Sequence, residues 1–442
     1  MKKINFYNPW HKNPFFKHNY LPKRKRNLFF EVEKYLSKKM IISISGLRRM
    51  GKTTIMKQLI AKFLNTKIDS KNIFFYSFSE TDNDVEKILY YYFNNICPFD
   101  IHEAKVYIFL DELQYVKNWQ EILKFYYDLN SSIHFVISGS SSLYLHQKTK
   151  ESLAGRIIDL KLNILTFQEN LYLKHNITQI KYDFFENDFF EKIKKAEKNL
   201  SIYQDDFFTY LQKGEFPEII NEKDNDFIFN YLSNAVIDKI FNKDIALFEI
   251  NKKKEFLTLY KIVAQNCAQM INKTNIAASL GINFKTITNY LNIQEKAFLI
   301  YLIPNYLRSI RSQEKSYKKV FIASINLLLN ILEIDNFTNI PFIDFKGHLI
   351  ENYVFNVLKN KYEKIFFYHH LQKEVDIVLE KGQEIIPLEI KAKATYKKSD
   401  LRNLINFALK KKISRAIFIY GGFSCKENIA GIDIYFLPYY FL

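Results

Sequence analysis

Between Met40 and about Leu165, short apolar runs alternate with stretches whose apolar residues recur every three or four positions. The runs are MIISIS, NIFFYSF, KVYIFL and IHFVISG, all rich in β-branched or aromatic residues. Such alternation of buried strands with amphipathic helices is typical of a parallel sheet covered by helices on both faces. We therefore predict an α/β fold for this part of the chain.

The pattern changes further along. From about Thr166 to Ile262, Tyr, Phe and Leu recur at helical spacing among many Lys and Glu residues, which predicts a helical region. KTNIAASLGINFKTITNYL, which begins at Lys273, predicts two short helices joined by a turn. A stretch rich in β-forming residues follows, and from about Gly347 the chain again predicts helices and strands.

The segment MIISISGLRRMGKTTIMKQLI holds a G-x-x-x-x-G-K-T motif between an apolar strand and an amphipathic helix, the context that a phosphate-binding loop requires. The glycines let backbone N–H groups turn towards phosphates, and the helix N-terminus adds positive potential. Lys52 is expected to reach the β- and γ-phosphates, and the Thr53 hydroxyl to hold Mg²⁺. The expected nucleotide-binding residues are Gly46, Leu47, Arg48, Arg49, Met50, Gly51, Lys52, Thr53, Thr54 and Ser138.

Two acids end the strand in KVYIFLDELQ. Asp111 is expected to bind Mg²⁺ through water, and Glu112 to orient and polarise the attacking water. The later strand IHFVISGSSS ends in hydroxyls; either Ser138 or Ser140 senses the γ-phosphate, or the Gly-Ser run is an ordinary turn. No Asn-Lys-x-Asp guanine-reading motif is present, which favours ATP over GTP.

The charge balance points to polyanionic partners. With 64 Lys and Arg against 47 Asp and Glu, the formal net charge is +17. A field of this sign favours nucleic acid, and secondarily an anionic membrane surface. Residues 1–28 end in PKRKR and form either a solvated arm or one that grips phosphates. The start lacks the apolar core of a signal peptide, and no apolar run approaches the ~18 residues of a membrane span, so we expect a cytoplasmic protein.

The segment from Lys273 fits a compact DNA-binding unit. Thr274 is expected to cap the first helix, Gly281 to make the turn and Asn283 to cap the second helix. The second helix would bury Ile287, Tyr290 and Leu291 and present polar residues to a DNA groove, namely Lys285, Thr286, Thr288 and Asn289. The strands that follow would form a basic wing able to grip phosphates through Arg308, Arg311, Lys315, Lys318 and Lys319. Alternatively, this unit packs against the ATPase and never touches DNA.

The last segment carries acids in a helix–strand–turn–strand order. Glu351 lies on the amphipathic stretch GHLIENYVFNVLKN, Asp376 on EVDIVLE, and Glu389 with Lys391 on EIIPLEIKAK. Alternation on a strand puts Glu389 and Lys391 on one face. Asp376 and Glu389 are expected to share a hard divalent cation, most simply Mg²⁺, with Glu351 completing the shell. Lys391 would polarise the attacking water or steady the phosphate.

The ordered motifs GLRRMGKTT, FLDELQ, SGSSS and LAGR resemble those of prokaryotic AAA-type ATPases that are followed by a domain of unknown function. YLQKGEFPE, KDI, AQN, KGHLIEN and EVDIV extend the resemblance over nearly the whole chain. It implies that Arg156, in LAGR, serves a neighbouring subunit's nucleotide in a homo-oligomer, or else forms a structural salt bridge. Ser324 departs from the pattern, because relatives tend to carry an aspartate there. The acids of the last segment resemble the restriction-endonuclease-like PD-(D/E)xK fold.

These observations predict an α/β P-loop NTPase sheet, then a helical and winged-helix region, then a restriction-endonuclease-like α/β domain. The expected parts are a basic arm (1–28), a AAA-type ATPase domain (29–200), a helical and winged-helix domain (201–330) and a nuclease-like domain (331–442). The predicted function is Mg²⁺-dependent ATP hydrolysis coupled to action on nucleic acid, with DNA favoured, and with or without metal-dependent cleavage. The alternative is an ATP-driven switch that binds DNA or a protein partner without cutting.

Overall fold

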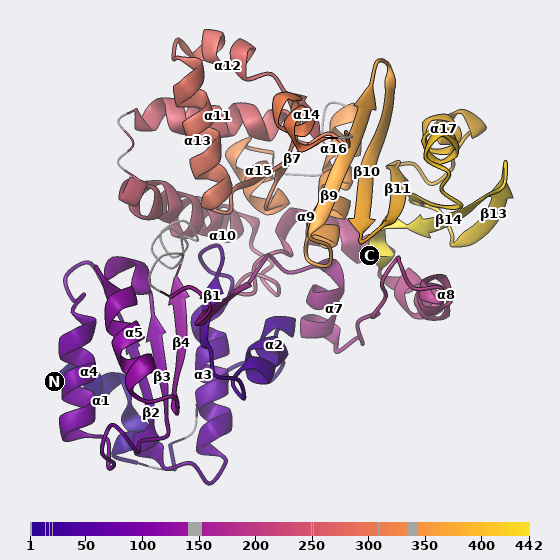
Figure 1. The fold of residues 1–442 in the computed structure, drawn as a ribbon. Helices are drawn as coiled ribbons and strands as arrows, with labels where there is room; N and C mark the ends of the chain where they lie inside the picture. Colours follow the sequence, from indigo (N-terminus) through magenta and orange to yellow (C-terminus); the bar gives the residue numbers. More distant parts are fainter. Residues whose placement is uncertain are drawn as a thin grey trace. The chain divides into compact units, whose positions relative to one another are not determined.

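The computed structural model describes residues 2–442 except 14, 17, 20, 140–152, 249, 251, 308 and 335–342. The chain divides into two compact units, each described by itself below (Figure 1). Unit 1 comprises Met1–Asn163 with Lys296–Phe298, and unit 2 comprises Ile164–Glu295 with Leu299–Leu442. Among the described residues, none of the helices combines the length and the apolar character needed to cross a bilayer.

Unit 1 is built on a five-stranded parallel sheet with the order β2-β3-β4-β1-β5. Its strands are β1 (Ile41–Ser45), β2 (Ile73–Ser77), β3 (Val106–Asp111), β4 (Ile133–Gly139) and β5 (Ile157–Lys161). The four predicted runs are confirmed as β1 to β4. The edge strand β5 was not predicted: its IIDLK sequence is short and only Leu160 in it is buried, so it lacks the apolar run that marks the central strands.

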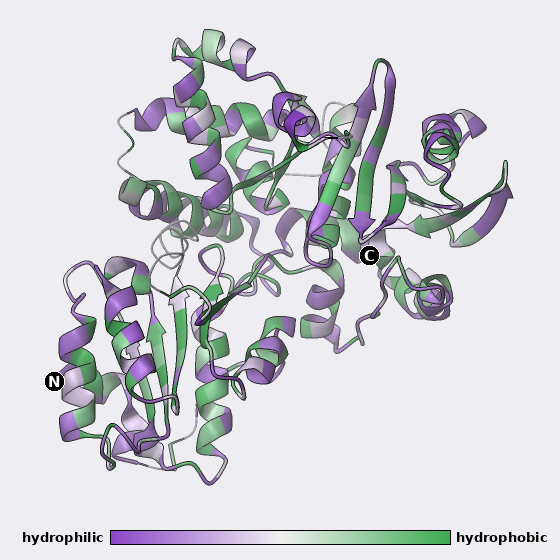
Figure 2. Cartoon of the chain, in the orientation of Figure 1, coloured by the Kyte–Doolittle hydropathy of each residue, from purple (hydrophilic) through white to green (hydrophobic). Residues whose placement is uncertain are grey.

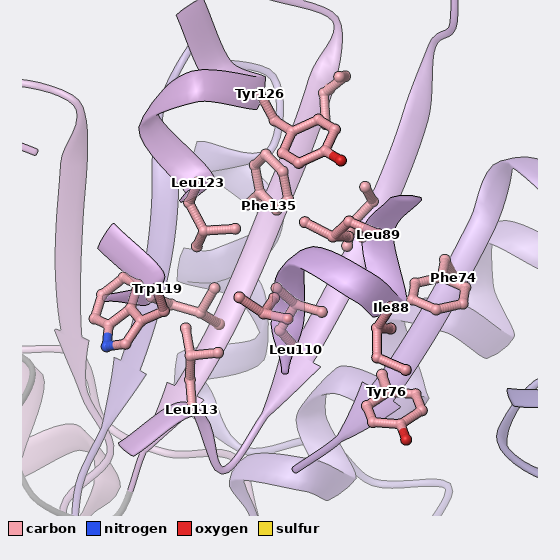
Figure 3. Close-up of a cluster of buried hydrophobic side chains, with 14 of the residues drawn as sticks. Phe74, Tyr76, Ile88, Leu89, Leu110, Leu113, Trp119, Leu123, Tyr126 and Phe135 are labelled. Carbon is pink, nitrogen blue, oxygen red and sulfur yellow. The ribbon is translucent and has the colours of Figure 1, made fainter. Parts of the chain in front are cut away.

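Helices cover both faces of this sheet. They are α2 (Asn27–Tyr35), α3 (Lys52–Leu64), α4 (Val85–Asn95) and α5 (Trp119–Leu129). On one face, α4 and α5 pack on β2, β3 and β4 through a buried cluster that includes Phe74, Leu89, Leu110, Trp119 and Phe135 (Figure 3). The central strands are apolar along their length, whereas the helices have one apolar and one polar side (Figure 2). This division fixes the strand ends, and therefore the loops that follow them, on a rigid core.

The N-terminal segment packs against the sheet of unit 1, so the expectation of a solvated arm is wrong for its first part. α1 (Lys2–Tyr7) lies beside β2, the edge strand. The buried Asn8 amide continues the ladder of that strand: Nδ2 donates to the carbonyl of Phe75 at 2.9 Å and Oδ1 accepts from its N–H at 2.7 Å. Trp10, in the 3-10 turn Pro9–His11, donates from Nε1 to the Ile73 carbonyl at 2.8 Å.

Unit 2 begins with a helical region, as predicted. Its helices are α7 (Phe167–His175), α8 (Phe189–Leu200), α9 (Gln204–Lys213), α10 (Asn225–Asn230) and α11 (Lys253–Gln265), with π-helical turns at Tyr231–Ile237 and Ile240–Asp244. Next come α12 (Lys273–Leu280) and α13 (Phe284–Lys296), then α14 (Ile310–Lys315) and α15 (Ile325–Ile331). An antiparallel sheet with the order β6-β8-β7 joins them, built from β6 (Gln269–Ile271), β7 (Ile300–Ile303) and β8 (Lys318–Ile322).

A buried carboxylate ties two parts of unit 2 together. Glu215 is fully buried just after α9, and its oxygens accept from Ser324 Oγ at 2.6 Å, Ile325 N at 3.1 Å and Asn326 N at 2.8 Å. These donors lie at the start of α15, whose N-cap is Ser324. Because a helix N-terminus leaves N–H groups unpaired, a carboxylate there is well placed. Ser324 thus has a structural role as the N-cap of α15 and as a donor to Glu215.

The C-terminal part of unit 2 is a six-stranded mixed sheet with the order β13-β14-β12-β11-β10-β9. The strands are β9 (Lys364–His370), β10 (Lys373–Lys381), β11 (Glu384–Ile390), β12 (Arg415–Tyr420), β13 (Cys425–Ile429) and β14 (Ile432–Pro438). The pairs β9–β10, β10–β11 and β13–β14 are antiparallel, whereas β11–β12 and β12–β14 are parallel. α16 (Ile343–Lys359) precedes the sheet in the sequence. α17 (Arg402–Lys411) follows β11 and precedes β12, and it packs on the sheet.

Candidate functional site

The loop after β1 has the geometry of a phosphate-binding loop. Gly46 adopts φ +148°, and a Cβ there would lie 2.2 Å from the Leu162 carbonyl oxygen, so a larger residue would push the loop off the sheet. Gly51 adopts φ +95° and directly precedes α3, where it serves as N-cap. Glycine alone tolerates both conformations cheaply. The loop therefore leads directly into the N-terminus of α3.

Lys52 and Thr53 occupy the first turn of α3. Lys52 is buried, and its ammonium donates to the carbonyls of Gly46 at 2.9 Å and Leu47 at 2.8 Å. The Thr53 hydroxyl donates to Asp111 Oδ2 at 2.8 Å, which joins the phosphate loop to the end of β3. The two motifs that the sequence separates by more than fifty residues thus meet at one edge of the sheet, as predicted.

Asp111 is surrounded by hydroxyl groups. Besides Thr53, Ser77 donates to its Oδ2 at 3.5 Å, and Ser138 makes a short hydrogen bond to its Oδ1. Burial and the adjacent Glu112 carboxylate raise the pKa of Asp111, while the hydroxyls of Ser138 and Thr53 oppose that shift. A buried carboxylate ringed by neutral donors is charged at a cost, which a bound cation would remove.

Ser138 links the two acids. Its Oγ accepts from the backbone N–H of Glu112 at 3.3 Å while it donates to Asp111. Glu112 itself has φ +57°, a left-handed conformation rarely adopted by residues other than glycine, and its carboxylate accepts from Gln114. Ser138 therefore positions the acids as well as lining the site; Ser140, the alternative sensor, lies outside the described residues.

The remaining loop residues differ in exposure. Leu47 and Met50 are buried, Arg48 is half-buried with Nη2 2.9 Å from Tyr115 Oη, and Arg49 is exposed with φ +65°. Thr54 is half-buried in the first turn of α3. Leu47 and Met50 thus anchor the loop to the core.

Sequence reasoning missed Arg26, which it placed in the basic arm. Arg26 is only 8% exposed, and its guanidinium donates to the carbonyls of Met50 at 3.0 Å and Asn163 at 3.0 Å. The Gln58 amide of α3 also donates to the carbonyls of Pro22 and Arg24. The second half of the N-terminal segment is therefore hydrogen-bonded to the phosphate loop at Met50 and to α3 at Gln58. The four charged residues of PKRKR look alike in sequence, and nothing local marks which one turns inward.

Arg156 lies at the N-terminal ends of the parallel strands β1 and β5, whereas the phosphate loop follows the C-terminal end of β1. It immediately precedes β5, and its carbonyl accepts from the N–H of Ile41 at the start of β1, whereas Gly46 follows the end of β1. Its guanidinium pairs with Asp128, with Nε–Oδ1 at 2.9 Å and Nη2–Oδ2 at 3.3 Å. This geometry matches the salt-bridge alternative and separates Arg156 from the nucleotide loop of its own chain.

The predicted C-terminal residues gather around one pocket of unit 2, of about 750 Å³. Register pairs Ile377 with Leu388, which places Asp376 and Glu389 beside each other one step further along the ladder. Asp376 Oδ2 accepts from the N–H of Ile390 at 2.8 Å. The pocket lining includes Lys319, Glu351, Glu374, Asp376, Glu389 and Lys391.

Glu389 and Lys391 lie on one face, as predicted. Lys391 Nζ is 2.6 Å from Glu389 Oε1 and 4.0 Å from Asp376 Oδ2. The other oxygen of Glu389, Oε2, is buried and accepts no hydrogen bond. Burial, and secondarily Asp376, raises the pKa of Glu389 well above its usual range. An unpartnered buried carboxylate oxygen on the wall of a polar pocket fits a hard cation, for which oxygen is the preferred ligand.

Glu351 is placed differently from the prediction. Its Oε1 lies 2.6 Å from Nζ of Lys319, which also contacts Glu374 Oε1 at 2.7 Å. Lys319 is only 2% exposed, so the expectation that it grips phosphate from the wing is wrong. Among the residues that the structure describes, no group of three or more His, Cys, Asp or Glu side chains is arranged to hold a metal ion. The predicted three-carboxylate shell is thus reduced to Asp376 and Glu389.

The helix-turn-helix residues fall largely as expected. Gly281 makes the turn with φ +62°, and Asn283 Oδ1 accepts from the N–H of Thr286 at 2.7 Å. The first helix, however, is capped by Asn272 and not by Thr274, because Asn272 Oδ1 accepts from two N–H groups at 3.1 Å. On α13 the inward residues Ile287, Tyr290 and Leu291 are buried.

The polar side of α13 and the β7–β8 connection are accessible. Lys285 and Asn289 are exposed, and Thr286 and Thr288 are half-buried. The connection contains the short helix α14, which was not predicted, and its Arg311 and Lys315 are exposed. Lys318 pairs with Glu314 at 3.1 Å, and Arg308 lies outside the described residues. Among the predicted contact residues that the structure describes, the exposed basic and polar groups are therefore fewer than the sequence predicted.

Comparisons with known proteins agree with this division of the chain. A family model described as an AAA domain matches residues 38–171, and two domains of unknown function, DUF8612 and DUF4143, match residues 204–338 and 346–440. Two uncharacterized proteins of Methanocaldococcus jannaschii are 28% and 27% identical over 66% and 84% of this chain and 63% and 79% of their own lengths. An uncharacterized Haemophilus influenzae protein is 24% identical over 89% of this chain and 92% of its own. The chain thus covers slightly less than two thirds of the first of these relatives.

Solved structures give weaker similarities. A signal-transduction ATPase with a tetratricopeptide repeat sensor from Pyrococcus horikoshii is 12% identical, with 76% of this chain and 45% of that chain covered and a TM-score of 0.25. DnaA from Aquifex aeolicus bound to AMPPCP is 14% identical, with 66% and 92% covered and a TM-score of 0.25. The family models and the geometry of the loop carry the assignment: residues 38–171 form a AAA-type P-loop ATPase domain, followed by two domains of unknown function.

Proposed function

We propose that this chain is a Mg²⁺-dependent ATPase whose nucleotide lies on the loop from Gly46 to Thr54. The observation that supports it best is the 2.8 Å contact between Thr53 Oγ1 and Asp111 Oδ2. A hydroxyl and a carboxylate in contact beside a phosphate loop are the ligand set that Mg²⁺–nucleotide sites use.

Each residue has a definite task in this proposal. Lys52 exchanges its contacts with the Gly46 and Leu47 carbonyls for the β- and γ-phosphates. Glu112 accepts the proton of the attacking water. Ser138 holds Asp111 and the backbone of Glu112 in position through its two hydrogen bonds. Thr53 and Asp111 would hold Mg²⁺, which would supply positive charge to offset the charge that develops on the phosphoryl group.

The test is ATP turnover of Lys52→Ala, measured as phosphate release. We expect a loss of at least about a hundredfold, because an electrostatic contact to the transferring phosphoryl group is removed. Lys62→Ala is the matched control: Lys62 is at the other end of α3 and pairs with Glu33 at the surface. Retention of turnover by Lys52→Ala, with Lys62→Ala also active, would refute the assignment.

We further propose that unit 2 acts on nucleic acid, with DNA favoured, through a winged helix and a nuclease-like domain. The net charge of +17 and the exposed Lys285 and Asn289 on α13 support DNA binding. The strand order around Asp376, Glu389 and Lys391 supports the PD-(D/E)xK likeness. Lys285→Ala should weaken DNA binding in fluorescence anisotropy and flatten its salt dependence, whereas Lys364→Ala, a surface control on β9, should not.

Cleavage would depend on the carboxylates of the pocket. Asp376 and Glu389 provide two carboxylates, which suffice for a Mg²⁺ ion that keeps several waters. The test is incubation with DNA and RNA, with and without ATP and Mg²⁺, beside Asp376→Ala. Loss of cleavage in that variant, with ATP turnover unchanged, supports a nuclease centre; equal cleavage by both proteins would place the activity elsewhere.

One observation favours the alternative of a non-cutting switch. Lysines pair with three of the pocket's carboxylates, Glu351, Glu374 and Glu389, and so neutralise much of its charge. In that case binding of DNA or a protein partner depends on ATP, and no substrate is cut with Mg²⁺ or Mn²⁺. The same incubation separates the two functions.

Arg156 belongs to a proposal about assembly. Because it lies at the sheet edge away from its own phosphate loop, it reaches a nucleotide only from a neighbouring subunit of a homo-oligomer. An Arg156→Ala chain mixed with a Lys52→Ala chain tests this, since one interface would then keep both residues intact. Recovery of turnover on mixing supports action in trans; no recovery leaves the ion pair with Asp128 as its role.

A further inference from the structure

Two adjacent lysines on β8 have opposite environments. Lys318 is about a quarter exposed and pairs with Glu314 of α14, whereas Lys319 is 2% exposed and points into the carboxylate pocket. Alternation along a strand turns neighbouring side chains to opposite faces. β8 lies at the centre of the sheet β6-β8-β7, so the ammonium of Lys319 enters the pocket from a strand outside the six-stranded sheet.

Lys319 contacts carboxylates from two other elements. Its Nζ lies 2.6 Å from Glu351 on α16 and 2.7 Å from Glu374 on β10. A buried ammonium costs several kcal/mol unless acids neutralise it. These two acids are therefore engaged by the protein's own cation.

The other two carboxylates of the pocket are engaged differently. Asp376 receives the backbone N–H of Ile390, and Glu389 pairs with Lys391 through one oxygen only. Glu389 is only 6% exposed, and its Oε2 accepts no hydrogen bond. Glu351 Oε1 likewise accepts no hydrogen bond, but it already lies 2.6 Å from the Lys319 ammonium. The oxygen that a further cation would serve best is therefore Glu389 Oε2, beside Asp376.

We propose that Lys319 is a built-in cation of the carboxylate pocket: it holds Glu351 and Glu374 and confines any divalent metal to Asp376 and Glu389. The part of this proposal that concerns a bound metal rests on the proposed nuclease-like function. The role of Lys319 as the neutralising cation does not. Lys319 is thereby a specificity-determining residue, because it sets how many carboxylates a metal meets. It also makes the pocket depend on the β6-β8-β7 sheet, which supplies the ammonium.

The first experiment measures Mn²⁺ binding by calorimetry in the full-length protein. Glu389→Gln is expected to weaken binding by at least about tenfold, whereas Glu351→Gln changes it less than about twofold. In a Lys319→Met background Glu351 is released, so Glu351→Gln there is expected to weaken Mn²⁺ binding by about tenfold as well. If Glu351→Gln weakens binding in the otherwise unchanged protein as much as Glu389→Gln does, the proposal is overturned.

The second experiment needs no metal. Thermal unfolding in EDTA is compared for Lys319→Met, Glu351→Gln and the double variant, with Lys318→Met as the control from the same strand. Lys319→Met should lower Tm by more than about 5 °C, and adding Glu351→Gln should recover part of that loss, because the uncompensated charge is gone. Lys318→Met should change Tm by less than about 2 °C, since its pair is at the surface. Additive effects of Lys319→Met and Glu351→Gln would overturn the pairing.

The two experiments separate the proposals. One outcome is that the Tm effects of Lys319→Met and Glu351→Gln are non-additive and that only the Lys319→Met variant binds Mn²⁺. That result supports Lys319 as the built-in cation, and it removes the metal-dependent nuclease from the proposed function because the unchanged protein binds no metal. Binding by the unchanged protein with additive Tm effects supports the nuclease metal and overturns the role of Lys319. Coupling without Mn²⁺ binding in any variant supports Lys319 as the neutralising cation and overturns the metal statement in both.

Discussion

The phosphate loop of unit 1 and the carboxylate pocket of unit 2 both gather charged side chains in buried surroundings, but they balance the charge differently. At the loop, the Lys52 ammonium donates to backbone carbonyls, and Asp111 accepts from three hydroxyls. In the pocket, Lys319 and Lys391 pair directly with carboxylates. Neutral dipoles can be exchanged for a charged ligand at small cost, whereas an internal ion pair must first be broken.

This difference implies that the loop depends on its ligand and the pocket depends on its own lysines. ATP and Mg²⁺ would complete the first site from outside. In the second, the pocket's own lysines pair with its carboxylates, although Glu389 Oε2 accepts no hydrogen bond. The variants below test this contrast, beginning with the largest expected effect.

The largest effect is expected for Lys391→Met. The variant leaves the buried Glu389 beside Asp376 without its ammonium. Breaking a fully buried ion pair on one side costs about 3–5 kcal/mol of unfolding free energy, and because Lys391 is 33% exposed we expect a loss at the lower end of that range. Thr53→Val, which removes one neutral donor from Asp111, should cost only about 1–2 kcal/mol. Urea denaturation with a separate probe for each unit measures both, and equal losses would contradict the contrast.

An intermediate effect is expected from pH at Glu215, a buried carboxylate balanced by neutral donors but without an open pocket. Burial raises its pKa from 4.5 to about 7 despite the hydrogen bonds from Ser324, Asn326 and Ile325. Between these values the native state holds a proton that the unfolded state has released, so stability falls as pH rises. Relative to Glu215→Gln, the unchanged protein should lose about 2.5 kcal/mol between about pH 5 and pH 8. A pH-independent difference between the two proteins in urea titrations would show that neutral donors alone hold this charge.

The smallest effect is expected for Arg26→Ala. It removes the brace on the Met50 carbonyl without touching the nucleotide, so KM for ATP should rise about threefold to tenfold while kcat changes little. Arg26→Lys, which restores one donor, should recover part of the loss. A fall in kcat with unchanged KM would instead place Arg26 in the chemical step.

Sequence patterns predicted best where one local rule decides the structure. The spacing from Gly46 to Thr53 demands a loop and a helix start, and an apolar run ending in Asp111 demands a buried strand; both predictions are confirmed. Gly281 and Asn283 define the turn between α12 and α13 in the same way. In each case a backbone conformation or a cap selects the residue type, so the signal is readable in a few neighbouring letters.

Prediction failed where contacts between distant segments decide. Lys318 and Lys319 look equivalent in sequence, and only the partner elements α16 and β10 select the one that is buried. Arg26 is one of several basic residues in PKRKR, and its partners lie at Met50 and Asn163. The strand β5 forms because β1 offers it a free edge, although its own sequence is weakly apolar.

The pairing of Asn8 with the backbone of Phe75 has a practical consequence. Together with Trp10 it covers the outer edge of β2, and an uncovered strand edge is a template for joining other chains. Removal of about the first twelve residues would therefore expose this strand edge and make the ATPase domain prone to aggregation. A purification tag for this domain is better attached elsewhere than in place of these residues.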